Sequence, residues 1–363
     1  MVRLQKILDR FFGSLIILTL SLFRHFGRTP SGNKTFLVIK LWAIGDAVIS
    51  LPLIRGIKES FPGAKVDVLL RDKVKDIFEC YPVDKIFSLD NLSDVVGLLG
   101  NGRRYDVVID CEPYLNLSAI LAFFVGKQRI GFANQKRSVL YTLKTPFRKN
   151  QHMVQNYLDL LRKLQISWDT DQLEKLLVED SIEKNIDIFL KDRKKNKLTV
   201  GITAGVGASS KNRQWQEERF ASLSDRIINE LNADVIFIDS IENLKIIERI
   251  ISLMNEKPIN SIGLFNLKET FGLIERCNVY ISNDTGPLHI AAAQGCSTIG
   301  LFGPNSPVLW GPYGSGNTFI HKTKLPLAIE NDKGINREGN REGYMGCIEV
   351  KDVYDLVQKI ILP

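Results

Sequence analysis

The fold of this chain is decided by residues 282–289, which read SNDTGPLH, together with the segments on either side. Residues 278–281 have the pattern of a short buried strand, and the alanine-rich residues 290–295 favour a helix. A strand, a polar turn and a helix start present backbone N–H groups to an anion, and the helix dipole favours negative charge there. The stretch therefore predicts a phosphate site at the carboxyl end of a strand. Its candidate residues are Asp284, Thr285, Gly286 and, one turn into the helix, His289, which either contacts a phosphate or only packs.

A similar boundary lies near the start of the chain. Residues 36–41 form a continuous apolar run that breaks at residues 42–46, WAIGD, and residues 47–58 continue with apolar positions at helical spacing. Asp46, preceded by Gly45, thus stands where a strand gives way to a helix. It is either a helix N-cap, a position that Asp fills well, or a general base, and the residues alone leave both open.

Strand and helix patterns alternate along the rest of the chain. Further strand candidates are residues 65–70, 85–88, 105–110, 129–132, 198–202, 234–238 and 297–302. This alternation predicts parallel, doubly wound sheets, in which ligands bind at the carboxyl ends of strands. A charged stretch at residues 191–197 separates two such series, so we expect an α/β protein with two Rossmann-like halves.

A third candidate site follows the first strand of the second half, at residues 206–215, VGASSKNRQW. Small residues let the backbone approach a ligand closely, and hydroxyl groups beside two cations suit a diphosphate. The two cations are Lys211 and Arg213. They would equally fit a solvated face before a helix, and the segment alone does not decide between the two.

Two long segments resemble the ADP-heptose:lipopolysaccharide heptosyltransferase family, glycosyltransferase family 9. One is residues 282–295 with the LFGP turn at 301–304; the other is the strand, Gly-Asp loop, helix and Phe-Pro of residues 36–62. The resemblance runs from about residue 35 to the C-terminus and omits residues 1–34 and roughly 322–345, where extra cysteines common in the family are missing. It implies the GT-B fold, two Rossmann-like doubly wound domains facing a central cleft.

The resemblance also implies a domain layout. We expect residues 1–34 to be a membrane-proximal segment, 35–190 an acceptor-side domain and 197–345 a domain that binds the nucleotide sugar. By analogy with the family, the last helix, within residues 346–363, should pack back on the N-terminal domain.

The family's chemistry implies roles for individual residues. Asp46 takes the place of the proposed catalytic base, Arg213 that of a side chain on the donor phosphates, and Ser209 that of a nearby hydroxyl. The expected reaction is an inverting transfer of a sugar from a nucleotide diphosphate, with ADP-heptose as the default donor and a lipopolysaccharide-core or related glycan as acceptor. No cofactor is expected. Metal-independent transfer is favoured because no Asp-x-Asp motif stands at a suitable strand end.

Two other classes of function remain open. A non-catalytic protein that binds nucleotide sugars would share these motifs. A nucleotide-dependent oxidoreductase is disfavoured, because the loop at residues 42–46 holds one glycine and lacks the G-x-G-x-x-G pattern.

Composition agrees with a globular enzyme. The 363 residues suffice for two domains, and 44% are hydrophobic. The formal net charge of +7 suggests anionic partners or serves solubility, and no nucleic-acid-binding motif accompanies it. The five cysteines are widely spaced without a Cys-x-x-Cys pair, which favours a reducing cytosol over a metal site.

The first 30 residues carry a mostly apolar stretch, 11–23, with basic residues on both sides. The stretch is shorter than the ~20 residues that a span needs, and no small-x-small cleavage site follows it. We expect either an interfacial helix on the anionic inner face of a membrane or a helix packed on the protein. The first alternative predicts a cytoplasmic, peripherally associated enzyme.

Overall fold

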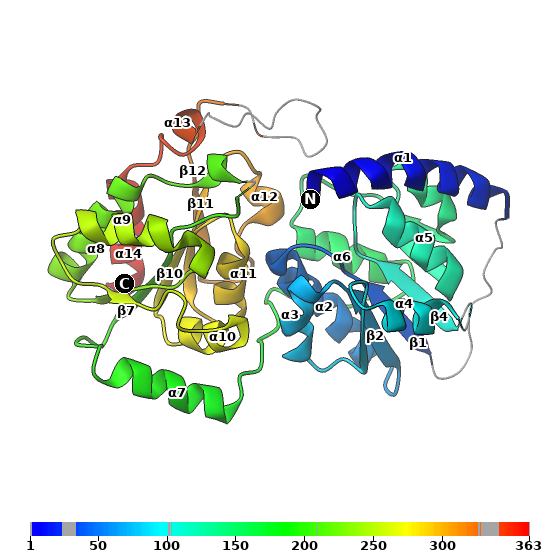
Figure 1. Cartoon of the computed structure of the whole chain (residues 1–363), viewed down its shortest axis with the longest axis horizontal. Coiled ribbons are helices and arrows are strands. Elements are labelled where there is room, and N and C mark those ends of the chain that lie inside the picture. Colours follow the sequence, from blue (N-terminus) through cyan, green and yellow to red (C-terminus); the bar gives the residue numbers. More distant parts are fainter. Residues whose placement is uncertain are drawn as a thin grey trace. The chain divides into compact units, whose positions relative to one another are not determined.

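The computed structural model describes residues 2–23, 34–100, 102, 104–208, 210–325, 327 and 341–362. The chain divides into two compact units, residues 1–170 and 171–363. Each unit is built on one six-stranded parallel sheet with helices around it (Figure 1). The expectation of two Rossmann-like domains is confirmed.

The first unit begins with a long helix, α1 (Val2–Leu20), and the short turn η1 (Ser21–Phe23). Its strands are β1 (Thr35–Ile39), β2 (Lys65–Leu70), β3 (Lys85–Ser88), β4 (Tyr105–Asp110), β5 (Gly126–Phe132) and β6 (Leu143–Thr145). Its other helices are α2 (Ile44–Ser60), α3 (Lys75–Glu79), α4 (Leu92–Leu99), α5 (Asn116–Val125) and α6 (Met153–Arg162), with 3₁₀ turns η2 (Asp72–Val74) and η3 (Lys136–Leu140). The strand order is β3-β2-β1-β4-β5-β6.

The second unit repeats this plan. Its strands are β7 (Thr199–Thr203), β8 (Asp234–Phe237), β9 (Ile259–Asn260), β10 (Val279–Asn283), β11 (Ser297–Phe302) and β12 (Thr318–His321). Its helices are α7 (Asp180–Lys191), α8 (Glu217–Leu231), α9 (Leu244–Leu253), α10 (Leu267–Glu275), α11 (Gly286–Ala293), α12 (Pro307–Trp310), α13 (Arg341–Tyr344) and α14 (Val350–Ile361), with 3₁₀ turns η4 (Lys211–Arg213) and η5 (Ile241–Asn243). The order β12-β11-β10-β7-β8-β9 is that of the first sheet read from its other edge.

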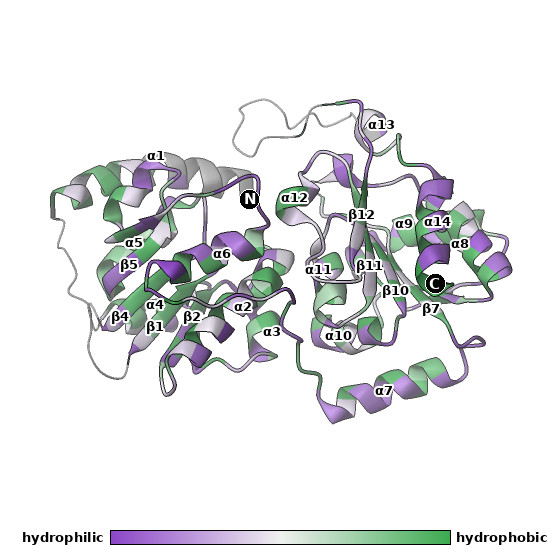
Figure 2. Cartoon of the chain, turned by 180° about the vertical axis from the view of Figure 1, so that it is seen from behind, coloured by the Kyte–Doolittle hydropathy of each residue, from purple (hydrophilic) through white to green (hydrophobic). Residues whose placement is uncertain are grey.

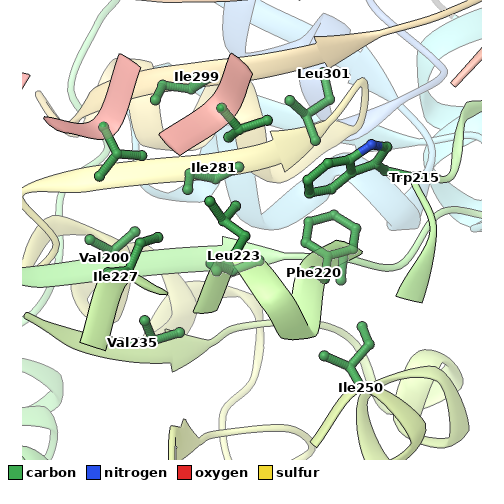
Figure 3. Packing of buried hydrophobic residues seen from close by; sticks show 14 of the residues in the cluster. Val200, Trp215, Phe220, Leu223, Ile227, Val235, Ile250, Ile281, Ile299 and Leu301 are labelled. Carbon is green, nitrogen blue, oxygen red and sulfur yellow. The ribbon is translucent and has the colours of Figure 1, made fainter. Parts of the chain in front are cut away.

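The core of the second unit explains why its central strands read as continuous apolar runs. Ile281 of β10 and Ile299 of β11 are fully buried, because helices cover both faces of a parallel sheet. Trp215 and Phe220 close one end of this core, with ring centroids 4.9 Å apart (Figure 3). Trp215 is thereby anchored in the core at the end of the loop that follows β7.

The structure places two helices differently from the expected domain layout. α7 belongs to the second unit, since Ile186 packs beside Gly272 of α10, and the boundary therefore falls at residue 170 rather than 190. α14 lies on α8 and the second sheet instead of the first unit. The reason is that Val353 and Val357 are fully buried in the second unit's core.

α1 is packed on the first unit along one side. Ile17 is buried among Ala119, Ile120 and Phe123 of α5 and its neighbours. The Asp9 carboxylate accepts hydrogen bonds from the backbone N–H groups at positions 116 and 117, at 2.9 and 2.7 Å, and so caps α5. In the described part of the chain, no helix combines the length and the apolar character needed to cross a membrane.

Candidate functional site

The strand order places every described candidate residue at one of two equivalent positions. In each sheet the connections reverse direction beside one central pair, β1 and β4 in the first unit and β7 and β10 in the second. Ligands of doubly wound sheets bind outside the carboxyl ends of the strands at such a switch point. Asp46 follows β1, Arg213 follows β7, and residues 284–289 follow β10.

At the first switch point, Asp46 lies in the first turn of α2 and does not cap it. The N-cap is Ala43, at a φ of 64° in the left-handed region. The N-cap alternative for Asp46 is therefore wrong. The carboxylate is 28% exposed and lies where the helix dipole stabilises negative charge.

A buried ion pair between Lys40 and Glu112 stabilises this loop. Lys40 Nζ is fully buried, 2.7 Å from Glu112 Oε1 and 3.7 Å from Asp46 Oδ2. Burial alone would lower the pKa of Lys40, but the carboxylates of Glu112 and Asp46 outweigh it and raise the pKa above its usual value. A permanent positive charge therefore stands beside Asp46.

Glu112 also holds the backbone of the loop. Its Oε1 atom accepts hydrogen bonds from the backbone N–H groups of Leu41 and Trp42, at 2.6 and 3.1 Å. These bonds fix the chain just before Ala43, whose left-handed backbone is unfavourable for a residue with a side chain. The sequence analysis did not predict Lys40 and Glu112 as site residues. The one feature that could have indicated them is a charged residue shortly after each of two apolar strands.

At the second switch point, the accessible group is a cation. Arg213 Nη1 lies 3.3 Å from Asp284 Oδ2, with the arginine side chain 32% exposed and the aspartate 7%. The same Oδ2 accepts a hydrogen bond from Asn305 Nδ2 at 2.6 Å. The Asp284 carboxylate is thus engaged in holding Arg213.

The turn after β10 leaves two amides open. The backbone N–H of Asp284 donates to the Leu301 carbonyl in the sheet, while Thr285 is the N-cap of α11 and Gly286 its first residue. Within the described ranges, no acceptor takes up the backbone N–H of Thr285 or Gly286. Two such donors at a helix start, near a guanidinium, suit an oxyanion.

Asn283, at the end of β10, joins the two loops of this site. Its Nδ2 donates to the Ala204 carbonyl at 2.8 Å, and its Oδ1 accepts from the Trp215 backbone N–H at 3.0 Å. The segment that carries Arg213 is therefore pinned at both ends. Asn283 stands inside the quoted motif, yet its sequence position gave no sign of this long-range role.

Asp239, which follows β8, fixes the start of the same segment. Its carboxylate accepts from the Gly205 backbone N–H at 2.6 Å and from Asn243 Nδ2 at 2.7 Å. A Cβ atom on Gly205 would come within 2.2 Å of Asn243 Cγ, so only glycine fits there. Burial raises the pKa of Asp239 despite these hydrogen bonds.

His289 is buried one turn into α11. Burial lowers its pKa to about 4, and its Nδ1 has no hydrogen-bond partner among the described residues. The ring is therefore neutral near pH 7, and it adds no positive charge to the site.

The remaining candidates are less defined. Lys211 is exposed at the start of η4, and Ser209 lies outside the described residues. Among the residues described, no three His, Cys, Asp or Glu side chains are grouped so as to hold a metal ion, and all five cysteines are free thiols.

Comparison of the sequence with known proteins identifies a family. The model of "Glycosyltransferase family 9 (heptosyltransferase)" matches residues 99–335. The chain is 24% identical to the lipopolysaccharide core heptosyltransferase OpsX of Haemophilus influenzae over 77% of this chain and 82% of that one.

Solved structures show the same fold. A glycosyl transferase family 9 protein from Veillonella parvula has a TM-score of 0.76 at 21% identity, covering 93% of this chain and 99% of that one. The E. coli heptosyltransferase WaaC, solved with ADP and with ADP-2-deoxy-2-fluoro heptose, has TM-scores of 0.67 and 0.65 at 18% and 17% identity, with 90% and 99% coverage.

Proposed function

Since the chain belongs to glycosyltransferase family 9, we propose that this glycosyltransferase moves a heptose from ADP-heptose to a lipopolysaccharide-core or related glycan acceptor. The named relatives support the sugar and the acceptor class. The E. coli structures with ADP and an ADP-linked fluoroheptose support the donor. Two observations carry the proposal: the first unit has an accessible carboxylate at Asp46, and the second unit has an accessible Arg213 beside two open amides.

In this proposal Asp46 is the catalytic base. It accepts the proton of the acceptor hydroxyl as the oxygen attacks the anomeric carbon, while the bond from that carbon to the diphosphate oxygen breaks. Attack opposite the leaving group inverts the anomeric configuration. Lys40 and Glu112 are positioning residues, because they hold the loop that carries Asp46.

The leaving ADP would bind at the second switch point. The Arg213 guanidinium and the amides of Thr285 and Gly286 supply positive charge and N–H donors for the developing diphosphate charge. Because these groups can perform the stabilisation that a cation performs elsewhere, we propose a metal-independent transfer. Lys211 and Ser209 belong to the same loop as Arg213 in the sequence and would also contact the donor. His289 would offer only a neutral ring.

We further place the reaction on the cytoplasmic side, at the inner face of an anionic membrane. The reason is the acceptor class, since a lipid-linked glycan brings the reacting hydroxyl to a membrane surface. The basic residues around residues 11–23 and the net charge of +7 favour such a surface.

One experiment tests the reaction. Purified protein is incubated with ADP-heptose and a heptose-deficient core acceptor, and we expect ADP release together with an acceptor heavier by one heptose. The alternative, a non-catalytic protein that binds nucleotide sugars, would bind ADP by calorimetry and leave the acceptor unchanged.

A further inference from the structure

The outward side of α1 carries large apolar side chains that the protein leaves uncovered. Phe12, Leu15 and Leu18 are 64%, 65% and 68% exposed, and Ile16 and the following Leu22 are also exposed. We call these five residues the α1 apolar face. The four that lie within α1 recur at spacings of three and four residues, which puts them on one side of the helix, and Leu22 follows in η1.

The opposite side of α1 is fixed to the first unit, so the orientation of this face is fixed too. Gly13 and Ile17 are buried against α5, and a Cβ atom on Gly13 would lie 2.6 Å from Asn116 Cβ. Close packing at Gly13 and the Asp9 cap leave the helix no freedom to roll its apolar face inward. The usual arrangement, apolar side in and polar side out, is therefore absent from the described part of α1.

The helix beside α1 also carries apolar side chains that are partly uncovered. Leu117 and Phe124 of α5 are nearly half exposed and lie two helical turns apart, on one side of that helix. Figure 2 shows hydrophobic colour on the coloured part of α1 and on α5, and the two helices pack side by side. Two neighbouring helices thus present apolar side chains of the same unit to the surroundings.

The charge around this surface indicates its partner. Residues 11–23 contain no Asp, Glu, Lys or Arg, whereas Arg10 precedes them and Arg24 and Arg28 follow. Lys136 is exposed on η3, which also packs against α1. An apolar stretch flanked by cations in the sequence, with the exposed Lys136 on the neighbouring turn, matches an anionic phospholipid surface, where acyl chains accept the apolar groups and headgroups attract the cations.

We propose that the α1 apolar face inserts into an anionic phospholipid membrane, with α1 lying in the plane of the headgroups. This rests on the proposed function only in that the acceptor is lipid-linked. It adds to that function the docking surface: the first unit docks by α1, with α5 packed beside it.

The test uses the full chain and vesicles of phosphatidylcholine with or without phosphatidylglycerol. The variant Leu15→Gln/Leu18→Gln removes two inserting side chains and keeps good helix formers. We expect its partitioning onto anionic vesicles to fall on the order of 100-fold, since each buried leucine is worth about tenfold. The matched control, Ile188→Gln/Leu264→Gln, changes two equally exposed apolar residues of the second unit and should float as the wild type does.

Measurements of folding and turnover separate membrane docking from the transfer reaction. Circular dichroism, thermal unfolding and turnover on a short soluble acceptor should be unchanged in the leucine variant, because no candidate site residue lies in α1. Wild-type protein that fails to float, or a leucine variant that floats equally well, would overturn the proposal. A leucine variant that changes oligomeric state in gel filtration without changing flotation would do so too, by assigning the face to a second copy. Flotation without any transfer activity would instead refute the proposed function and leave the membrane surface standing.

Discussion

The two switch points share one strand order and carry opposite arrangements of charge. In the first unit a buried cation, Lys40, holds an accessible carboxylate, Asp46. In the second a buried carboxylate, Asp284, holds an accessible cation, Arg213. The accessible groups are similarly exposed, at 28% and 32%, and their buried partners are nearly or fully covered. One topology thus presents a negative group at one site and a positive group at the other.

This difference shows which part of the site the fold supplies and which part the side chains supply. The sheet delivers a loop and a helix start at each switch point, and both helix starts favour negative charge. A buried charge needs a partner of opposite sign, and accordingly Lys40 lies beside two carboxylates and Asp284 beside a guanidinium. Exchanging or neutralising these four residues is therefore the direct way to test the comparison.

The largest expected effect is on turnover. Asp46→Asn should lower kcat by roughly 10²–10⁴, because an amide cannot accept the acceptor proton. ADP affinity, measured by titration calorimetry, should stay at the wild-type value. Near-normal turnover in this variant would remove Asp46 from the chemistry and leave the first switch point without a base.

The buried pair beneath Asp46 should control stability. Lys40→Met should lower the free energy of unfolding by about 3–5 kcal/mol, since it leaves Glu112 buried without its cation. In Lys40→Met/Glu112→Gln, an amide oxygen can still accept from the Leu41 and Trp42 N–H groups, so most of that loss should be recovered. Urea unfolding of both variants measures this; equal losses in the two would mean that charge pairing is not what holds the loop.

The second switch point should respond through donor binding. Arg213→Ala should weaken ADP binding by about 1.5–3 kcal/mol, the range for a charge-assisted hydrogen bond. Asp284→Asn should weaken it less, because the guanidinium remains but loses its buried partner. Calorimetry with ADP gives both values. Unchanged affinity in Arg213→Ala would contradict the assignment of the leaving-group site.

The effect of His289 on stability is negligible near neutral pH and develops only in acid. Its folded pKa of about 4 lies below the ordinary value of 6.5, so the unfolded chain binds the proton more readily. The resulting loss of stability is absent above pH 7, grows as the pH falls from 6.5 to 4, and reaches about 3 kcal/mol below that. The stability advantage of wild type over His289→Gln should shrink across that window. A constant difference would mean that the ring is not desolvated.

The sequence predicted the sheets best where both faces are covered. Continuous apolar runs marked β1, β4, β10 and β11, because burial on both faces removes polar alternation. The edge strands β6, β9 and β12 escaped prediction. β6 and β9 hold only three and two residues, which are too few to carry a pattern.

The site was predictable only as far as local motifs reach. Asp46, Arg213 and the turn after β10 stand in contiguous motifs. Lys40 and Glu112 are 72 residues apart, and their pairing depends on β1 and β4 being neighbours in the sheet. The same holds for Asn283 and its two partners, which lie on the loop after β7.

The separate cores have a consequence for how such an enzyme can change. The partners described for Asp46 all lie before residue 170, and those described for Arg213 all lie after it. Under the proposed function, substitutions that retune acceptor choice in the first unit would leave nucleotide recognition in the second unit intact. A junction at residues 170–171 is therefore a natural crossover point, both for recombination between related genes and for chimeric enzymes that combine the first unit of one protein with the second unit of another.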